Sequence, residues 1–198
     1  MPGSGKPQGT MIVVVGPSGA GKDSLINGAR AYFRDDPHVG FVQRVITRAA
    51  DGETEDHQSV SMSEFAAMET AGMFAVWWQA HDLHYGIPAR TIDELSSGKT
   101  LIVNGSRKAL SRFAPAFPSL AVIEVTARPD VIAERLKLRG RESGEEIERR
   151  LTREAGHWRP DCPFERVDNS RILTVAQQDF VEAVERLGNL QPLVGSRA

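Results

Sequence analysis

Apolar, β-branched runs alternate with stretches of helical periodicity along most of the chain. The runs that predict strands are 11–15, 41–46, 99–103 and 121–125, with a short one near 166–168. The stretches that predict helices are 24–33, 63–71, 88–96, 106–113, 129–139, 145–157 and 177–187. Strands that alternate with helices are typical of a parallel sheet with crossover helices on both faces. The pattern therefore predicts an α/β fold.

Three residues mark the ends of predicted helices. Ser63 precedes an apolar run and is a candidate N-cap, because its side chain can accept a hydrogen bond from the first turn. Gly98 follows the predicted helix 88–96 and is a candidate stop signal. Pro129 suits the first position of a helix, where the N–H that proline lacks has no intrahelical partner.

The first predicted strand runs directly into a glycine-rich segment with the spacing G-x-x-x-x-G-K. Its residues are Gly16, Pro17, Ser18, Gly19, Ala20, Gly21 and Lys22. Glycines let successive backbone N–H groups converge on one anion, and the helix that follows favours negative charge at its N-terminus. Lys22 adds a positive charge for the β- and γ-phosphates of a nucleotide. The segment predicts a phosphate-binding loop, and the alternative is a turn without a ligand.

The position after Lys22 differs from the commonest form of this loop. It normally carries Ser or Thr for a magnesium ion, but here it is Asp23, which Ser24 follows. Because a carboxylate holds Mg²⁺ directly or through its water shell, we expect Asp23 and Ser24 to form the metal side of the loop. A second Gly-Ser-Gly-Lys segment, residues 3–6, has no strand before it and is not expected to bind phosphate.

The chain is expected to form one domain over residues 11–190, between a flexible N-terminal tail (1–10) and a C-terminal tail (191–198). Residues 35–97 depart from βαβ regularity and carry an aromatic patch, so they predict an inserted acceptor-binding subdomain. The arginines and glycines at the start of 139–150 are typical of a lid that closes over phosphates. A solvent-exposed connection between helices is the alternative for that segment.

Composition narrows the class of protein. The 198 residues are 40% hydrophobic, which is enough for a core, and the net charge of −2 does not imply nucleic acid as a partner. The single cysteine, Cys162, excludes an internal disulfide and has no obvious base beside it, so it is interpreted as structural. No stretch predicts a membrane span or a signal peptide, and a cytoplasmic location is expected. The oligomeric state stays open.

Four groups of motifs together resemble the guanylate kinase superfamily. They are the loop 16–24, Thr47-Arg48 with Gly52-Glu53, the segment 74–86, and the arginine-rich segment 135–151. The resemblance covers nearly the whole chain after the N-terminal tail. It implies a parallel-sheet core, an acceptor subdomain and an arginine lid, and transfer of the γ-phosphoryl group of ATP, with Mg²⁺, to a phosphate.

The chain departs from guanylate kinases where those enzymes read their acceptor. Val76 stands where they carry a glutamate for the guanine edge, and an apolar group cannot accept hydrogen bonds from the base. Their second arginine after Thr-Arg is absent, because Ala49-Ala50-Asp51 follows Arg48. Their acidic residue at the end of a strand is here Asn104, in Asn104-Gly105-Ser106-Arg107. The purine pocket is therefore expected to be lost.

With these departures taken together, the chain resembles a narrower family, the ribose 1,5-bisphosphate phosphokinases. That resemblance implies ATP-dependent conversion of ribose 1,5-bisphosphate to 5-phospho-α-D-ribose 1-diphosphate, with small molecules as partners and neither nucleic acid nor membrane. The alternatives are a guanylate or other nucleoside monophosphate kinase, and a catalytically inactive module that binds proteins. A GTPase is disfavoured, because the chain has no Asn-Lys-x-Asp signature.

The resemblance also assigns residues to roles. The expected catalytic residues are Lys22, Arg139, Arg141 and Arg150; Arg135 and Asn169 are expected to help bind ATP. The expected acceptor-binding residues are Arg44, Arg48, His81, Tyr85, Gly86, Asn104, Ser106 and Arg107. Other interpretations stay open for three of them: a surface salt bridge for Arg44, a core position for Tyr85, and an exposed turn for Arg107.

Overall fold

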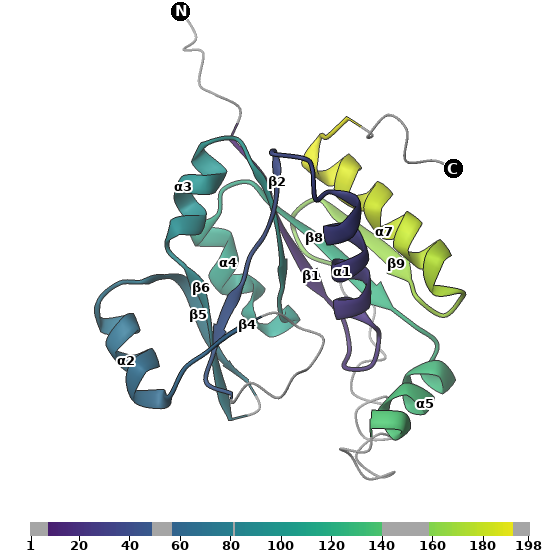
Figure 1. Ribbon diagram of the computed structural model, residues 1–198, viewed down its shortest axis with the longest axis horizontal. Coiled ribbons are helices and arrows are strands. Elements are labelled where there is room, and N and C mark those ends of the chain that lie inside the picture. The colour runs from purple at the N-terminus through teal and green to yellow at the C-terminus, as the bar shows by residue number, and fades with distance from the viewer. Residues whose placement is uncertain (1–7, 49–56, 81, 140–158, 192–198) are drawn as a thin grey trace, which may run out of the picture.

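A five-stranded parallel sheet forms the centre of the computed structural model, which describes residues 8–48, 57–80, 82–139 and 159–191. Its order is β2 (Val39–Phe41), β7 (Thr100–Asn104), β1 (Met11–Val15), β8 (Leu120–Thr126) and β9 (Phe164–Asp168) (Figure 1). All four neighbouring pairs run parallel. The carboxyl ends of these strands therefore meet at one edge of the sheet, where ligands bind in open α/β folds.

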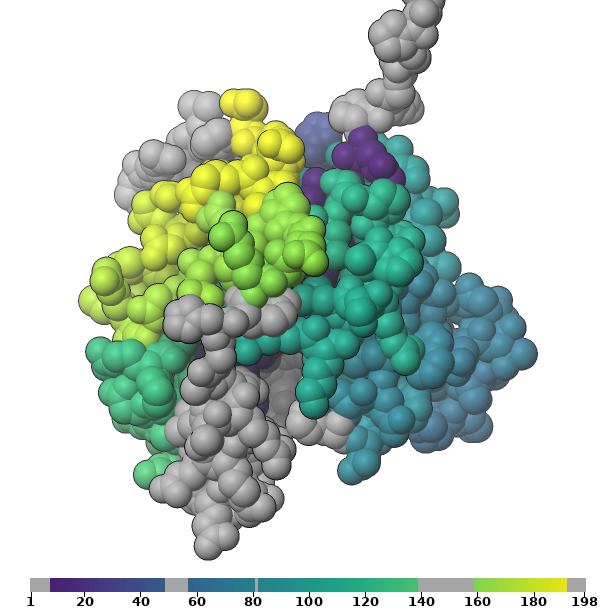
Figure 2. All heavy atoms as spheres, turned by 180° about the vertical axis from the view of Figure 1, so that it is seen from behind, coloured from purple at the N-terminus to yellow at the C-terminus, as the bar shows by residue number. Residues whose placement is uncertain are grey.

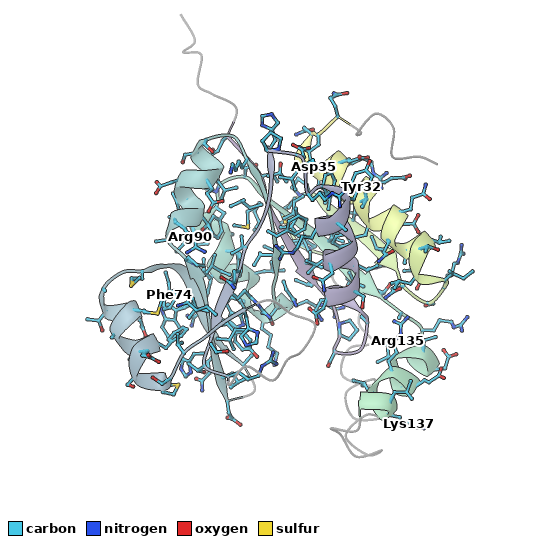
Figure 3. The ribbon with its side chains drawn as sticks, viewed as in Figure 1. Tyr32, Asp35, Phe74, Arg90, Arg135 and Lys137 are labelled. Atoms are coloured by element: carbon cyan, nitrogen blue, oxygen red, sulfur yellow. The ribbon has the colours of Figure 1, made fainter. Side chains whose placement is uncertain are left out.

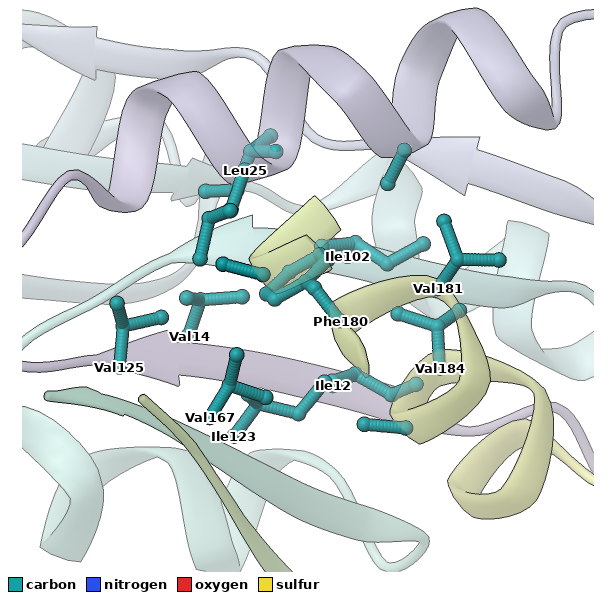
Figure 4. Close-up of a cluster of buried hydrophobic side chains, with 14 of the residues drawn as sticks. Ile12, Val14, Leu25, Ile102, Ile123, Val125, Val167, Phe180, Val181 and Val184 are labelled. Carbon is teal, nitrogen blue, oxygen red and sulfur yellow. The ribbon is translucent and has the colours of Figure 1, made fainter. Parts of the chain in front are cut away.

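Helices cover both faces of this sheet. On one face lie α1 (Lys22–Tyr32) and α7 (Leu173–Gly188); on the other lie α3 (Arg90–Ser96) and α4 (Leu110–Ala116), the latter preceded by the 3₁₀ turn η1 (Arg107–Ala109). Strand β1 serves both faces. Ile12 and Val14 pack toward α1 and α7 (Figure 4), while Val13 and Val15 pack toward the other face. Such burial on both faces explains the unbroken apolar run in this strand. The α/β fold predicted from the sequence is confirmed.

A second, four-stranded sheet stands beside the first. Its order is β4 (His57–Ser59), β3 (Arg44–Ile46), β6 (Leu83–Pro88) and β5 (Phe74–Ala80), and α2 (Met62–Thr70) accompanies it. Strands β5 and β6 form an antiparallel hairpin, and β6 also pairs with β3. Buried side chains of the hairpin join the core on the α3 and α4 face of the first sheet. From behind, the blue segment of this sheet borders the teal segment that includes α3 and α4 (Figure 2).

Several expected boundaries were wrong. The expected strand 41–46 is two strands in different sheets, because Val42 N–H still bonds to the carbonyl of Ile102 in β7 and the chain then crosses to β6. Helix α2 is capped by Ser61 and not by Ser63: the Ser61 hydroxyl accepts from Glu64 N–H, and the Glu64 carboxylate accepts from Ser61 N–H. Helix α7 begins four residues earlier than expected, and the expected helix 145–157 lies outside the described residues.

Gly9 and Thr10 were expected to belong to a flexible N-terminal tail, but they bond to the domain. Gly9 N–H donates to the carbonyl of Leu95 at 2.9 Å, and the Thr10 hydroxyl lies 3.2 Å from that of Ser119. A side chain at Gly9 would meet the backbone of Lys99, so the chain is already packed against the domain at this point. Residues 1–7 and 192–198 lie outside the described ranges.

Candidate active site

The glycine-rich loop leaves the carboxyl end of β1 and leads into α1, as its sequence predicts. Gly16 has φ +147°, and a Cβ there would lie 2.1 Å from the carbonyl oxygen of Val125 in β8. Gly21 has φ +89°, and a Cβ there would lie 2.3 Å from Nδ2 of Asn169. Both positions therefore exclude other residues, through backbone conformation and through space. The loop passes this close to β8 and to the segment after β9.

The first turn of α1 presents its positive end to this loop. Gly21 is the N-cap and supplies no side-chain hydrogen bond to the helix, so backbone N–H groups of the first turn are available to an anion. Lys22 folds back over the loop, and its Nζ donates to the carbonyls of Gly16 at 2.8 Å and Pro17 at 3.0 Å. The ammonium group is thus held over the loop, as binding of a triphosphate tail requires.

Asp23 is joined to the end of β7. Nδ2 of Asn104 donates to Oδ1 of Asp23 at 2.7 Å, and both side chains are partly exposed. The contact follows from the register, because Val14 pairs with Asn104 and the loop begins two residues after Val14. Asn104 was expected to contact the acceptor, and the structure shows its amide bonded to the loop residue Asp23. Its amide fixes one carboxylate oxygen of the expected metal ligand, an arrangement common around metal sites.

Asn169 and Arg135 clamp the loop from the opposite side. Asn169 is 1% exposed, and its Nδ2 donates to the carbonyl of Ala20 at 2.8 Å. Arg135 extends from α5 (Pro129–Arg139) toward the loop (Figure 3), where it donates to the carbonyls of Ala20 at 3.3 Å and Asn169 at 2.9 Å. Oδ1 of Asn169 is buried and has no hydrogen-bond partner among the described residues, which leaves one acceptor beside the loop. Both residues lie where ATP was expected to bind.

On the acceptor side, Arg44 is held between aromatic rings. Its side chain is 7% exposed, and its guanidinium carbon lies 5.0 Å from the ring centroid of Tyr85 and 6.0 Å from that of Trp78. The Tyr85 and Trp78 rings stack 5.2 Å apart at 8°, because the two residues are paired across β5 and β6. Arg44 is therefore buried and not a surface residue, and cation–π contact stabilises it.

Arg48 follows a short segment that β6 fixes in place. Thr47 N–H donates to the carbonyl of His84 at 3.1 Å, and the Thr47 hydroxyl accepts from His84 N–H at 2.8 Å. These two bonds position the end of the segment that carries Arg48, which is partly exposed. Strands β3 and β6 thus bring Arg44 and Tyr85 together, and Arg48 follows β3 two residues after Ile46, which pairs with Tyr85.

Gly86 faces an aromatic ring of the second sheet. The sequence interpretation took it to allow close approach of the acceptor, but the space above it is occupied. A Cβ at Gly86 would lie 2.4 Å from Cε1 of Phe74. The Phe74 ring in turn stacks on Phe65, with centroids 4.6 Å apart. The glycine is required for packing within the second sheet.

The sequence analysis did not identify Glu124 and Arg166 as candidate site residues, although both belong to an ionic cluster with Arg107. Glu124 in β8 is 2% exposed; one of its oxygens accepts from Nη2 of Arg107 and the other from Nε of Arg166 at 2.7 Å. Arg107 is thus bonded to the sheet at the start of η1. Ser106 precedes it, and its hydroxyl makes no capping bond to that turn. The signal in the sequence was a single acidic residue inside the apolar run 121–125, since buried carboxylates are paired.

Some expected site residues lie outside the described ranges. They are His81, Arg141 and Arg150, and for Arg139 the structure describes the end of α5 but not the side chain. Within the described part of the chain, no three His, Cys, Asp or Glu side chains converge as a metal site. None of the helices in that part has the length and apolar character needed to cross a membrane.

Sequence comparison identifies the family. No protein-family model matches the chain. It is 50% identical over 186 residues to a Rhizobium etli protein named ribose 1,5-bisphosphate phosphokinase PhnN, and the match covers 94% of each chain. The chain belongs to the ribose 1,5-bisphosphate phosphokinase family. A family member from Agrobacterium fabrum, with the same name, is 48% identical over 183 residues, which are 92% of this chain and 100% of the relative.

A solved structure of known fold agrees with this family assignment. Guanylate kinase from Anaplasma phagocytophilum superimposes with a TM-score of 0.63 over 92% of this chain and 88% of its own. The identity is 17%, so this likeness supports the fold alone. The resemblance to guanylate kinases and to the phosphokinase family, expected from the sequence motifs, is confirmed.

Proposed function

We propose that this chain transfers the γ-phosphoryl group of ATP to ribose 1,5-bisphosphate and forms 5-phospho-α-D-ribose 1-diphosphate and ADP. The observation that carries the proposal is the 50% identity to a relative of that name over 94% of both chains. The geometry of the loop supports it, because left-handed glycines, an uncapped helix N-terminus and Lys22 together suit a triphosphate.

The donor side fits ATP with Mg²⁺. Residues 16–24 would hold the phosphates, while Arg135 and Asn169 fix the backbone of that loop. Asp23 and Ser24 would hold the metal, which suits Mg²⁺ because it usually takes one or two carboxylates and completes its shell with phosphates and water. When bound, the metal would offset negative charge between the β- and γ-phosphates. Asn104 orients Asp23 for this role.

The proposed chemistry needs no general base. An oxygen of the phosphate on C1 of the sugar is already ionised at neutral pH and attacks the γ-phosphorus. The bond from that phosphorus to the β,γ-bridging oxygen breaks, and ADP leaves. The protein must therefore supply alignment and positive charge, which is the main requirement of phosphoryl transfer. Arg44, Arg48 and Tyr85 are proposed to hold the attacking phosphate.

Arginines from the expected lid are proposed to complete the charge on the donor side. Arg139, Arg141 and Arg150 would contact the transferred group, with Arg141 as the principal candidate. Removal of such an arginine lowers turnover by a factor on the order of a thousand and affects nucleotide affinity much less. A loss of affinity at unchanged turnover would assign Arg141 to binding alone.

The acceptor side favours a phosphorylated sugar over a purine nucleotide. Val76, at the position of the guanine-reading glutamate, is 4% exposed and packs in the core with Trp78 and Ile87. A side chain buried in the core, and apolar, offers a purine base no hydrogen bond. This is the reason for preferring the sugar bisphosphate over GMP or AMP.

A direct assay tests the proposal. Purified protein would be incubated with ATP labelled at the γ-phosphate, Mg²⁺ and either ribose 1,5-bisphosphate, GMP or AMP, and the products separated. We expect label in the sugar diphosphate and none above background in GDP or ADP. Lys22→Met, which keeps the length of the stem and removes the charge, is the control for contaminating kinases. Faster labelling of GMP than of the sugar would overturn the proposal.

A further inference from the structure

Glu124, Arg107 and Arg166 form a charged cluster, here called the Glu124 bridge. Its members come from β8, η1 and β9, and the two arginines bond to different oxygens of one carboxylate. One carboxylate cannot neutralise two guanidinium groups, so the bridge carries a net charge of about +1. A buried carboxylate that is paired twice also holds its partners in place, since leaving it unpaired is costly.

The bridge lies at the ligand-binding edge of the sheet. The register places Glu124 between Val15, the residue before the loop, and Arg166. Its neighbours Ile123 and Val125 point toward α1 and α7, so Glu124 points to the opposite face. That is the face on which the β5 and β6 hairpin packs. The bridge and the aromatic residues beneath Arg44 therefore border the same side of the core.

Exposure within the bridge is graded. The Glu124 side chain is 2% exposed, that of Arg107 24% and that of Arg166 48%. The acid is thus hidden while the bases reach the surface, which is the arrangement that attracts anions. Nε of Arg166 donates to Glu124, and the two Nη atoms of Arg166 make no hydrogen bond among the described residues. Those two nitrogens carry four N–H donors, which suit the oxygens of a phosphate.

We propose that Arg166, held by Glu124 beside Arg107, binds the phosphate of the acceptor that does not react. This inference rests on the proposed function. A sugar bisphosphate carries two phosphates: the one on C1 reacts, and the one on C5 requires cations of its own. Arg166 supplies the binding contact, and Glu124 acts as a positioning residue that fixes both guanidinium groups. The site selects acceptors with a second phosphate over nucleoside monophosphates, which have one.

The test compares Arg166→Met with Arg186→Met. Arg186 is also an exposed arginine paired with a glutamate, but it lies on α7, on the other face of the sheet. For Arg166→Met we expect the KM for ribose 1,5-bisphosphate to rise about 10- to 100-fold, because a charge-assisted hydrogen bond to phosphate is lost. The KM for ATP should stay within about twofold. Arg186→Met should leave both values near those of the wild type.

A shorter acceptor shows which phosphate is bound. Ribose 1-phosphate keeps the reacting phosphate and lacks the one on C5. Wild-type protein should bind it far more weakly than ribose 1,5-bisphosphate, and Arg166→Met should bind the two with similar affinity. Equal losses for both acceptors in Arg166→Met, or no loss for either, would overturn the inference. Arg166→Lys should recover part of the preference, and Glu124→Gln should lose it while the protein still melts cooperatively.

Calorimetry separates this inference from the proposed function. Binding of ribose 1,5-bisphosphate is measured without ATP for the wild type, Arg166→Met and Arg186→Met. If no diphosphate product forms but Arg166→Met alone loses affinity, the proposed reaction fails and the anion site stands. If product forms and Arg166→Met binds as tightly as the wild type, the reaction stands and the anion site fails.

Discussion

Gly86→Ala tests whether this glycine serves packing or the acceptor. Its added Cβ would lie 2.4 Å from Cε1 and 2.5 Å from Cδ1 of Phe74, whereas ordinary carbon contacts are about 3.5–4.0 Å. The Phe74 ring must therefore move by about 1 Å. Phe65, which stacks on that ring, is 1% exposed and leaves little room for the movement.

Overpacking of this kind typically costs about 1–3 kcal/mol. In a domain of this size each kcal/mol lowers Tm by roughly 2–4 °C, so we expect Gly86→Ala to lower Tm by about 2–12 °C. Scanning calorimetry and urea unfolding would measure the loss. Phe74→Ala removes the ring atoms that clash, so the loss of stability in the double variant should be smaller than the sum of the losses in the two single variants by about 0.5–3 kcal/mol.

Kinetics of the same variants decide between the two roles. If Gly86 serves packing, Gly86→Ala lowers stability, and its KM for the acceptor at low temperature stays close to that of the wild type. If its melting temperature is unchanged and its KM for the acceptor rises several-fold, the glycine allows close approach of the substrate. The packing argument from the Phe74 distance would then be refuted.

Two further predictions concern other residues. Asn104→Leu should raise the Mg²⁺ concentration for half-maximal activity by about tenfold, because Asp23 loses the amide that orients it; an unchanged Mg²⁺ titration would contradict this. Burial, with a smaller contribution from Asp161, raises the pKa of the Cys162 thiol, which therefore stays protonated at neutral pH. We expect iodoacetamide to react more slowly with native than with unfolded protein near pH 8, and Cys162→Ser to keep full activity; equal rates would contradict this.

The phosphate-binding loop could be predicted from the sequence because its determinants are local. Strand β1, the glycines and Lys22 lie within twelve consecutive residues. Each of them acts on its immediate neighbours, through β-branched side chains, left-handed backbone or a charge at a helix start. The same holds for Pro129, which opens α5, and for Gly98, whose φ of +93° ends the helix before it. No distant contact is needed to specify these features.

The second sheet was harder to predict, because its strands are defined by their pairing. The hairpin of β5 and β6 carries aromatic residues on both faces: Trp77 contacts Phe65 and His84, while Trp78 packs toward the core of the first sheet. This pattern gives no clean alternation of polar and apolar positions. The division of residues 39–46 into β2 and β3 likewise depends on which strand pairs with each of them. Tertiary packing determines that pairing.

The hydrogen-bond partners of charged and polar residues also could not be predicted from the sequence. Asn104 lies 81 residues from Asp23, and Arg166 lies 42 residues from Glu124. The residue types suggested roles toward a ligand, since arginine and asparagine commonly contact phosphates and sugars. The fold shows that some of this capacity is used within the protein. Arg107, which was expected near the acceptor, bonds to Glu124, a residue that the sequence analysis did not single out.

The pairing of Asp23 with Asn104 explains why two departures from guanylate kinases occur together. Those enzymes combine a hydroxyl residue after the loop lysine with an acid at the strand end; this chain has the acid at Asp23 and a neutral amide at Asn104. Two carboxylates at the 2.7 Å of this contact would repel by about 6 kcal/mol at an effective dielectric constant of 20, and partial exposure would reduce that value. An acid at position 23 is therefore better matched by a donor than by a second acid at position 104. Compared with guanylate kinases, the negative charge of this chain lies at the start of α1 and not at the strand end. The turn between Asn104 and Arg107 therefore contains no acidic residue.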